Sequence, residues 1–352
     1  MNTDIYHIFP SHMTHLSPQL ISVFYKQFSQ FKQSFIVFGK DCNSTVYEEL
    51  GNKVENIYLV NNIGGLTKIV SRDSHILLHS LIPEVCKCFY LHKYSNISVV
   101  CWGSGIKMVS LKNYIMYPLK FLLYHSFKNM ITLMEPDQLY LQKKYRICNT
   151  INQPYLGERE FELQKYIDHR DNSVSREGSN VVFVGNNSTC IKSYIKIAQK
   201  KLWRFKDDID LHFMFHYDYN VQNLGILELK KVCNNNYPNY TFNTELYNLY
   251  DYAKYLDNCN IYICDEIRQT GLAAIYTLLK LGKKLYLNGN NYNWVTSLGC
   301  KVHHTDELTQ SSISDFLTPD SISIIQNNYK CIASFECVEN KIIGWNNVLK
   351  LI

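Results

Sequence analysis

Two apolar, strand-like segments in the second half of the sequence are each followed by polar residues that could bind a ligand or take part in catalysis. Residues 181–184 end at Gly185, and the next two side chains are the amides of Asn186 and Asn187. Glycine lets the backbone pass close to a ligand, and the free N–H groups of a helix that begins here would bind an anion. An ordinary strand-to-helix turn has the same pattern, so the anion site is one of two interpretations.

A second apolar segment, residues 261–264, leads through a polar loop into an apolar helix that begins near Gly271. The loop supplies a guanidinium, an amide and a hydroxyl, from Arg268, Gln269 and Thr270. A diphosphate could lie at the helix start, with Arg268 neutralising its charge and Thr270 donating a hydrogen bond. A solvent-facing loop that caps the helix is the alternative interpretation.

Two histidines of the first half, His15 and His79, follow strand-like segments and are candidate general bases. Histidine has a pKa near neutrality, so in a binding cleft it can take a proton from an attacking hydroxyl. A single histidine is more often structural, and this chain has 12 of them.

Other catalytic and metal motifs are missing from the sequence or badly placed. The pair Asp208 and Asp210 matches the DxD metal motif, but it precedes the apolar residues 211–215 and does not follow a strand. We interpret it as a solvated turn and expect no metal site. There is no CxxC pair, Walker A loop, GxGxxG, GxSxG or HExxH. Zinc ribbons, P-loop NTPases, typical dehydrogenases, α/β-hydrolases and zincins are therefore disfavoured.

Short apolar segments alternate with longer amphipathic ones through most of the 352 residues. Continuous apolar strands separated by helices are typical of parallel sheets covered on both faces. The expected strands are residues 5–9, 35–38, 57–60, 75–79, 97–102, 181–184, 211–215, 261–264 and 284–287. The expected helices are residues 17–31, 111–128, 189–200, 223–234, 244–256 and 271–281.

The alternation weakens where the sequence becomes polar, which indicates a domain boundary. We predict an N-terminal domain over residues 1–160, a linker over 161–180, a second domain over 181–335 and a C-terminal helix over 336–352. The expected fold class is α/β, with two Rossmann-like, doubly wound domains facing a central cleft. Ligands would bind at the carboxyl ends of the strands.

Charge and hydropathy restrict the location of the protein. The net charge is +5, without the compact basic runs of a nucleic-acid binder, and the amino terminus lacks signal-peptide features. No apolar stretch reaches 18 residues. Residues 112–128 mix basic, aromatic and aliphatic side chains, so this segment either lies in a membrane interface or packs on the N-terminal sheet. Its candidate membrane-contacting residues are Lys112, Tyr117, Lys120 and Lys128.

Residues spread in order along the chain resemble the TDP-N-acetylfucosamine:lipid II N-acetylfucosaminyltransferase family (4-alpha-L-fucosyltransferases). This family adds the last sugar of the enterobacterial common antigen repeat unit. The matching positions are residues 7–15, residues 35–41, His79, Trp102 with Gly103, residues 117–119, residues 184–186, Tyr217, residues 252–256 with Cys259, Arg268 with Gln269 and Gly271, Asn288, Trp294, and Gly344 with Trp345. The departures are in the first half: Ser104-Gly105 replaces Ala-Asp, His12 replaces an acid, and Leu16 replaces a second histidine.

The resemblance implies a GT-B glycosyltransferase that inverts the configuration at the anomeric carbon of the sugar and needs neither metal nor cofactor. In the second domain, Gly185, Asn186 and residues 268–271 would hold the donor diphosphate, Tyr217 would face the nucleobase, and Asn288 and Trp294 would line the pocket. The donor would be a TDP-sugar, N-acetylfucosamine being the expected sugar.

The first domain would bind a polyprenyl-diphosphate-linked saccharide, with Trp102 and Gly103 on the acceptor side. His15 is the first candidate base and His79 the second. The enzyme would be peripheral, on the cytoplasmic face of the bacterial inner membrane, and would act in surface polysaccharide assembly. Two alternatives stay open: a GT-B transferase that uses a UDP-sugar for capsule or O-antigen, and a non-catalytic protein that binds a nucleotide sugar.

Overall fold

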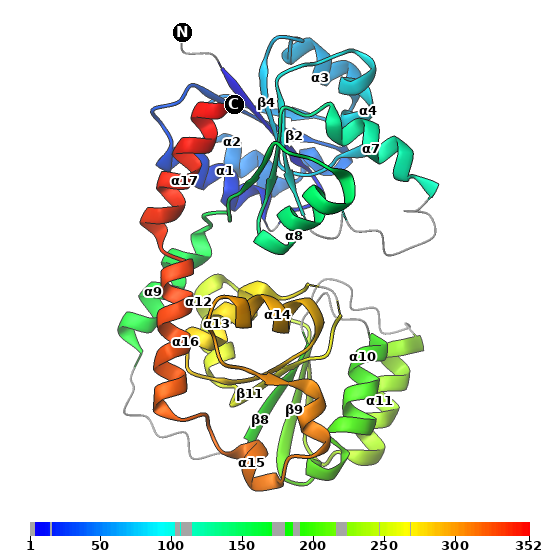
Figure 1. The fold of residues 1–352 in the computed structure, drawn as a ribbon, viewed down its shortest axis with the longest axis vertical. Helices are drawn as coiled ribbons and strands as arrows, with labels where there is room; N and C mark the ends of the chain where they lie inside the picture. The colour runs from blue at the N-terminus through cyan, green and yellow to red at the C-terminus, as the bar shows by residue number, and fades with distance from the viewer. Residues whose placement is uncertain are drawn as a thin grey trace. The chain divides into compact units, whose positions relative to one another are not determined.

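The chain forms two α/β units, each built on its own parallel sheet (Figure 1). Unit 1 comprises Met1–Glu158 and Val338–Ile352, and unit 2 comprises Arg159–Cys337. The structure is a computed structural model, and it describes residues 4–14, 16–102, 106, 115–170, 180–185, 191–215, 224–245, 247–267 and 269–352.

Among the described residues, the sheet of unit 1 is seven-stranded, in the order β3-β2-β1-β4-β5-β6-β7. The paired strands are parallel, and Ile8 at the centre lies opposite both Ile36 and Leu78. The strands are β1 (Ile5–Pro10), β2 (Gln33–Phe38), β3 (Ile57–Val60), β4 (His75–Leu78), β5 (Ile97–Cys101), β6 (Asn129–Thr132) and β7 (Thr150–Asn152).

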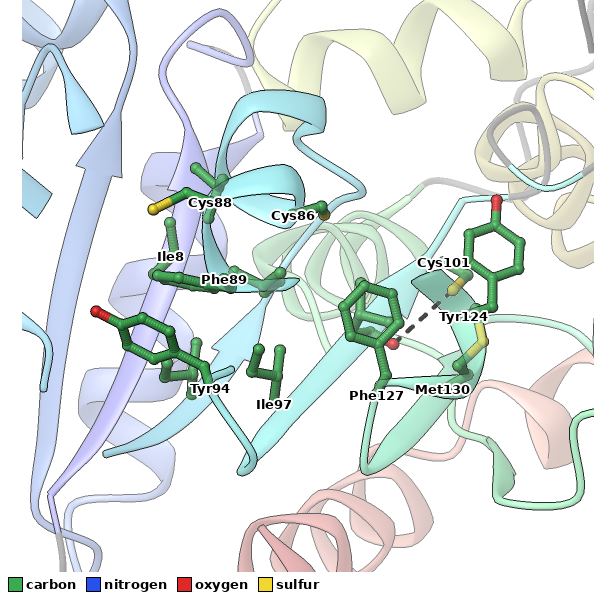
Figure 2. Packing of buried hydrophobic residues seen from close by; sticks show 14 of the residues in the cluster. Ile8, Cys86, Cys88, Phe89, Tyr94, Ile97, Cys101, Tyr124, Phe127 and Met130 are labelled. Carbon is green, nitrogen blue, oxygen red and sulfur yellow. Dashed lines mark hydrogen bonds between the residues drawn. The ribbon is translucent and has the colours of Figure 1, made fainter. Parts of the chain in front are cut away.

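Both faces of this sheet are covered, because side chains that alternate along each strand enter two separate cores. One core lies under α1 (Ser17–Gln27), α2 (Thr45–Gly51) and α17 (Val338–Leu351). The other lies under α3 (Ile63–Ile69), α4 (Pro83–Leu91), α7 (Tyr117–His125), α8 (Glu135–Tyr140) and the π-helical turn Leu141–Tyr145. Figure 2 shows part of the second core, with Phe89 beside Ile8 and Tyr124 near Cys101.

The C-terminal helix α17 belongs to unit 1, an assignment that the sequence prediction for residues 336–352 left open (Figure 1). Its Trp345 is 0% exposed and donates a hydrogen bond from Nε1 to the carbonyl of Pro154, at 2.9 Å. The indole also packs edge-on against Phe24 of α1, with ring centroids 4.9 Å apart. Val348, Leu349 and Ile352 enter the same core, so the buried face of α17 and the residue after it pack on unit 1.

Within the described residues, the sheet of unit 2 is six-stranded, in the order β10-β9-β8-β11-β12-β13. Helices α10 and α11 cover one face, and α12, α13 and α16 lie on the other (Figure 1). The strands are β8 (Asn180–Val184), β9 (Ile209–Met214), β10 (Tyr240–Asn243), β11 (Ile261–Cys264), β12 (Lys284–Leu287) and β13 (His303–His304). The helices are α10 (Ile191–Lys196), α11 (Leu224–Asn236), α12 (Leu249–Asp257), α13 (Leu272–Lys280), α14 (Gly289–Ser297), α15 (Ile313–Leu317) and α16 (Ile322–Phe335). Shorter helical turns are Lys40–Asn43 in unit 1 and Ile197–Lys201, Trp203–Phe205 and Thr305–Thr309 in unit 2.

Part of the predicted linker over residues 161–180 is helical. Helix α9 (Glu158–His169) packs through Tyr166, whose hydroxyl donates to Asp257 Oδ2 at 2.8 Å. The segment is amphipathic, with buried Leu163 and Tyr166 among polar residues, so its average polarity hides the helix. Residues 171–179 lie outside the described residues.

The predicted α/β fold class with two doubly wound parallel domains is confirmed. Strands predicted at 57–60, 261–264 and 284–287 have those bounds in the structure. Strands β6, β7, β10 and β13 were not predicted, since they have only two to four residues and carry polar side chains. The predicted helix over 111–128 is α7, which is shorter. In the part of the chain that is described, no helix has the length and apolar character needed to cross a bilayer.

Candidate functional site

Both sheets have a point at which the connections change from one face to the other, and ligands of doubly wound sheets bind beside that point, outside the carboxyl ends of the strands. In unit 1 it lies between β1 and β4, which are followed by Ser11 and His79. In unit 2 it lies between β8 and β11, which are followed by Gly185 and Asp265. The turns selected from the sequence are thus next to the two switch points.

The loop from β11 to α13 has a backbone conformation suited to glycine at its end. Gly271 has φ +66° and is the N-cap of α13. Gly185, which follows the neighbouring strand β8, has φ +72° and donates its N–H to Ile263 O of β11 at 2.7 Å. Asn291 of α14 is 0% exposed, and its side-chain amide makes two hydrogen bonds to the backbone of Thr270. Its Oδ1 accepts from the Thr270 N–H at 3.2 Å, and its Nδ2 donates to the Thr270 carbonyl at 2.8 Å. The Thr270 end of the loop is therefore held by the Asn291 side chain of α14.

Gly289, at the start of α14, is in backbone contact with this loop. It has φ +54°, and a Cβ added to it would lie 2.4 Å from the carbonyl oxygen of Ile267. The next residue, Asn290, donates its N–H to the same oxygen at 2.9 Å. Only glycine fits this approach, because any Cβ would push the β11–α13 loop away from its position.

A buried carboxylate, Asp265, connects the loops that follow β11, β12 and β13, and the sequence analysis did not identify it. Its oxygens accept hydrogen bonds from Thr305 Oγ1 (2.6 Å), Asn288 Nδ2 (2.7 Å), Lys196 Nζ (3.0 Å) and Lys201 Nζ (3.1 Å). Burial acts to raise the pKa of Asp265, but the hydrogen bonds from Thr305, Asn288 and Lys196 and the charge of Lys201 lower that pKa to about 2. This carboxylate is ionised and holds the strand ends together.

Asn288 belongs to that network. Its Oδ1 accepts from the backbone of Gly289 at 2.6 Å and faces His304 Nε2 at 3.1 Å, while its Nδ2 is bound to Asp265. The amide thus caps α14 and joins β12 to β13. The prediction that Asn288 lines the donor pocket stays a prediction, because the described contacts of the amide are all internal. Half-buried His304 lies at the same edge of the sheet.

Trp294 does not match the pocket-lining role expected for it. It is 3% exposed, its Nε1 donates to Tyr276 Oη at 2.7 Å, and its ring packs edge-on against Phe335 at 5.6 Å. These partners place it in the core between α13, α14 and α16. We correct the prediction: Trp294 is a packing residue, and its position six residues after Asn288, roughly 1.7 turns along α14, does not place the two side chains in a shared pocket.

His79 is also less accessible than a general base requires. It is 1% exposed, its Nε2 lies 3.0 Å from His7 Nδ1, and its Nδ1 lies 2.7 Å from the hydroxyl of Tyr155. Burial lowers the pKa of His79 well below its usual value, with a smaller contribution from His7. With both ring nitrogens engaged, His79 has no free position for an acceptor hydroxyl, so the second candidate base becomes a supporting residue.

Trp102, predicted on the acceptor side, follows β5 at the same edge of unit 1. It is half-buried, and its Nε1 donates to the carbonyl of His79 at 2.8 Å. Seven further predicted site residues lie outside the described residues: His15, Gly103, Lys112, Asn186, Asn187, Tyr217 and Arg268.

Helix α7 fits both interpretations of the basic and aromatic segment. Tyr117 packs on the unit, with its hydroxyl donating to Lys144 O at 3.0 Å, and Lys128 Nζ donates to Ile352 O at 2.9 Å. Burial lowers the pKa of Lys120. The solvent side is apolar, because Leu119 and Leu122 are 53% and 55% exposed. The predicted membrane residues Tyr117 and Lys128 thus make packing contacts, and the exposed leucines are better placed to meet a partner.

The DxD residues Asp208 and Asp210 lie at the amino end of β9, the opposite edge of the sheet from Gly185. Asp210 instead pairs with His212, at 3.3 Å between Oδ2 and Nε2. Over the described part of the chain, no group of three or more His, Cys, Asp or Glu side chains is arranged to hold a metal ion.

The buried pair His7 and His79 predicts acid sensitivity of unit 1. Burial lowers the pKa of His7 to about 3, whereas a histidine in the unfolded chain titrates near pH 6.5. Between these values the unfolded state binds more protons, so stability is full above about pH 6.5 and falls as pH decreases. We expect a loss of up to about 1.4 kcal/mol per pH unit for each histidine between pH 6.5 and 5.

Hydrogen exchange of the β1 and β4 amides, corrected for the intrinsic pH dependence of exchange, measures how the stability of unit 1 alone changes with pH. His7→Gln should remove about half of the slope, and His92→Gln, at an exposed position, should leave it unchanged. An opening free energy that is flat over this range would contradict the assignment, since the carboxylates of the unfolded chain titrate about two units lower.

No protein-family model matches this sequence, and no curated protein matches it. Its structure is similar to the trehalose-6-phosphate phosphatase N-terminal domain of Candida albicans, with a TM-score of 0.71, 9% identity, and coverage of 100% of this chain and 97% of the other. A glycosyltransferase from Rickettsia africae has a TM-score of 0.66, 12% identity and coverage of 99% and 98%.

A UDP-GlcNAc 2-epimerase from Neisseria meningitidis, solved with UDP-GlcNAc bound, is similar with a TM-score of 0.58, 10% identity, and coverage of 99% and 100%. At sequence identities this low, the structural similarity demonstrates a shared fold alone. Together with the strand orders, it shows that the chain has the GT-B architecture of two Rossmann-like domains.

Proposed function

We propose that the protein is a glycosyltransferase in which unit 2 binds a nucleotide-sugar donor and unit 1 binds the acceptor. The observation that carries this proposal is the carboxyl edge of the unit 2 sheet. There the glycine turn at Gly185, the start of α13 and the start of α14 adjoin one switch point, and Asp265 and Asn291 hold their loops in place.

The donor diphosphate would bind at the start of α13, where the N–H groups of the first turn have no partner within the helix. Arg268 would supply the positive charge. In the transfer step, an acceptor hydroxyl attacks the anomeric carbon, the bond from that carbon to the diphosphate breaks, and the diphosphate leaves with the electron pair. Inversion follows from attack on the opposite face. Stabilisation of the leaving group by N–H groups and a guanidinium needs no metal.

The acceptor proposed for unit 1 is a polyprenyl-diphosphate-linked saccharide, and His15 is the proposed base. The lipid part of such an acceptor stays in the bilayer, so the enzyme would dock at the cytoplasmic face of the inner membrane. The exposed leucines Leu119 and Leu122 of α7 support this docking segment, and Lys112 is a further proposed contact from the sequence. The proposed donor is a TDP-sugar, with N-acetylfucosamine as the sugar.

A UDP-sugar donor is the second candidate. Its support is the likeness to the Neisseria epimerase solved with UDP-GlcNAc and to UDP-forming trehalose-phosphate synthases of Burkholderia. A transferase with such a donor would serve capsule or O-antigen synthesis.

Calorimetry of TDP and UDP binding in the presence of EDTA tests the donor site. We expect one nucleotide to bind, and Arg268→Ala to weaken its binding by about 1.5–3 kcal/mol, the range for a hydrogen bond to a charged group. Gly289→Ala should weaken it as well, because the new Cβ would displace the loop at Ile267.

Gly299→Ala is the matched control, since Gly299 also has a positive φ, +89°, but its Cβ would meet only the Cys331 sulfur, at 3.3 Å. Each alanine would have to adopt a left-handed backbone conformation, which costs roughly 1–2 kcal/mol. Only a difference in nucleotide affinity between the two variants therefore reports displacement of the β11–α13 loop. A preference for UDP would select the second candidate. If neither nucleotide binds, the proposed function is wrong.

A further inference from the structure

Two aromatic side chains lie together at the carboxyl edge of the unit 1 sheet, Trp102 after β5 and Tyr155 after β7. Both are half-buried, and their ring centroids are 5.5 Å apart with an angle of 37° between the ring planes. Trp345 backs Tyr155, with centroids 5.5 Å apart and the planes within 11°. The pair therefore forms a supported aromatic surface at the edge where ligands of such sheets bind.

His79 holds both members of the pair through different groups. Its backbone carbonyl accepts the Trp102 indole N–H at 2.8 Å, and its ring Nδ1 lies 2.7 Å from the Tyr155 hydroxyl. A residue that is 1% exposed thus fixes two rings that solvent can still reach. This contact pattern explains why a histidine that cannot meet a substrate follows β4 at the switch point.

The buried end of this chain of contacts is His7, whose Nδ1 lies 3.0 Å from His79 Nε2. The nearby Gln33 amide Nε2 donates to the carbonyls of Phe24 and Phe28, at 3.3 and 2.8 Å. His79 Nδ1 lies 2.7 Å from the Tyr155 hydroxyl, so each ring nitrogen of His79 has a partner.

The hydroxyl of Tyr155 is thus held by the His79 ring, at 2.7 Å. Burial raises the pKa of Tyr155 well above its usual value, which keeps this hydroxyl protonated. A ligand suited to the pair presents a flat C–H face to the two rings. A pyranose ring has such a face.

We propose that Trp102 and Tyr155 form a stacking subsite for a sugar ring, and that His79 is the positioning residue that orients them. That this sugar belongs to the acceptor rests on the proposed function. The subsite itself depends only on the geometry of unit 1.

Saturation-transfer NMR on the full-length protein tests the subsite, with N,N′-diacetylchitobiose as the probe and sorbitol as a polyol without a ring face. Irradiation of the protein aromatic protons should saturate the ring C–H protons of the disaccharide and leave sorbitol unaffected. Trp102→Leu should weaken binding of the disaccharide about three- to tenfold, the range for one aromatic contact. Tyr90→Leu, which removes an exposed ring elsewhere on unit 1, should have no effect.

The positioning role of His79 is tested by a double-mutant cycle. Tyr155→Phe keeps the ring but removes the hydroxyl, and His79→Phe removes the ring nitrogens but keeps the carbonyl that binds Trp102. Each should weaken disaccharide binding about threefold, and the double variant should be no weaker than either single one, because they remove the same hydrogen bond. If His79→Phe does not fold, Tyr155→Phe against Tyr90→Phe still measures the loss.

Absence of saturation transfer to the disaccharide in the wild type, or equal transfer to sorbitol, would overturn the subsite. Additive effects in the cycle would overturn the role of His79. The nucleotide calorimetry is independent, since it reports unit 2. Sugar binding without nucleotide binding would keep the subsite and reject the transferase.

Discussion

Replacement of Asp265 by asparagine should destabilise unit 2 by about 3–5 kcal/mol, the range for breaking a buried ion pair. The side chain of Asp265 is 0% exposed and that of its partner Lys201 is 6% exposed. An asparagine would place an NH₂ group against either the Lys196 ammonium or the Thr305 and Asn288 donors, and Lys201 would keep only its ion pair with the exposed Asp306 carboxylate among the contacts of the described residues. Urea unfolding of unit 2 measures the loss.

Asp306→Asn is the matched control, because the Asp306 carboxylate binds the same Lys201 ammonium at 3.2 Å but is 76% exposed. An ion pair screened by water contributes roughly 0–1 kcal/mol. Nucleotide binding should follow the same order, with Asp265→Asn abolishing it and Asp306→Asn leaving it intact. Equal destabilisation by the two variants would show that burial of the network is not what stabilises the strand ends.

Protonation of Asp265 should also destabilise unit 2, in the same direction as its replacement. Its folded-state pKa, about 2, lies below that of an unfolded aspartate, so its contribution to stability is present above about pH 4 and is lost as pH falls toward 2. This window lies below the one expected for His7 and His79. The two units should therefore lose stability in different pH ranges, with unit 1 the first to weaken.

Trp345→Ala should destabilise unit 1 by about 3–5 kcal/mol, the range for removing a fully buried large aromatic side chain. The side chain is 0% exposed and packs against Phe24 and Tyr155, so its loss leaves a cavity under α17. Limited proteolysis should then cut within α17, and hydrogen exchange of the α1 amides should accelerate. Trp345→Phe separates out the hydrogen bond to Pro154, worth about 0.5–1.5 kcal/mol.

Ile343→Ala on the same helix is the control. Ile343 is 59% exposed, so its truncation should change stability by no more than about 0.5 kcal/mol. A loss comparable with that of Trp345→Ala would mean that helix propensity, and not docking of the indole, holds α17 in place. Because Trp345 backs Tyr155, Trp345→Ala should also weaken disaccharide binding at the proposed subsite.

The local sequence determined the parallel strands and several glycine turns. The segments 261–264 and 284–287 are apolar at nearly every position, which only a strand covered on both faces requires, and the structure has β11 and β12 there. The turns at Gly185 and Gly271 were recognisable because their left-handed backbone is available to glycine at little strain. The parallel direction of the strands followed from the alternation with helices, since consecutive parallel strands need crossovers, whereas the strand order came from the structure.

Only the tertiary structure decided which polar and aromatic side chains are buried. His303 and His304 form β13 solely because β12 pairs with them, and Asp265 looked like an ordinary loop residue until Lys201 and Thr305 were brought to it from other elements. Trp294 and His79 occupy positions that read as site residues in the sequence, yet both are inside the protein. Burial depends on elements distant in the chain, whereas strand and turn preferences depend on neighbouring residues, so the sequence by itself determined the framework and packing decided the chemistry available at its edges.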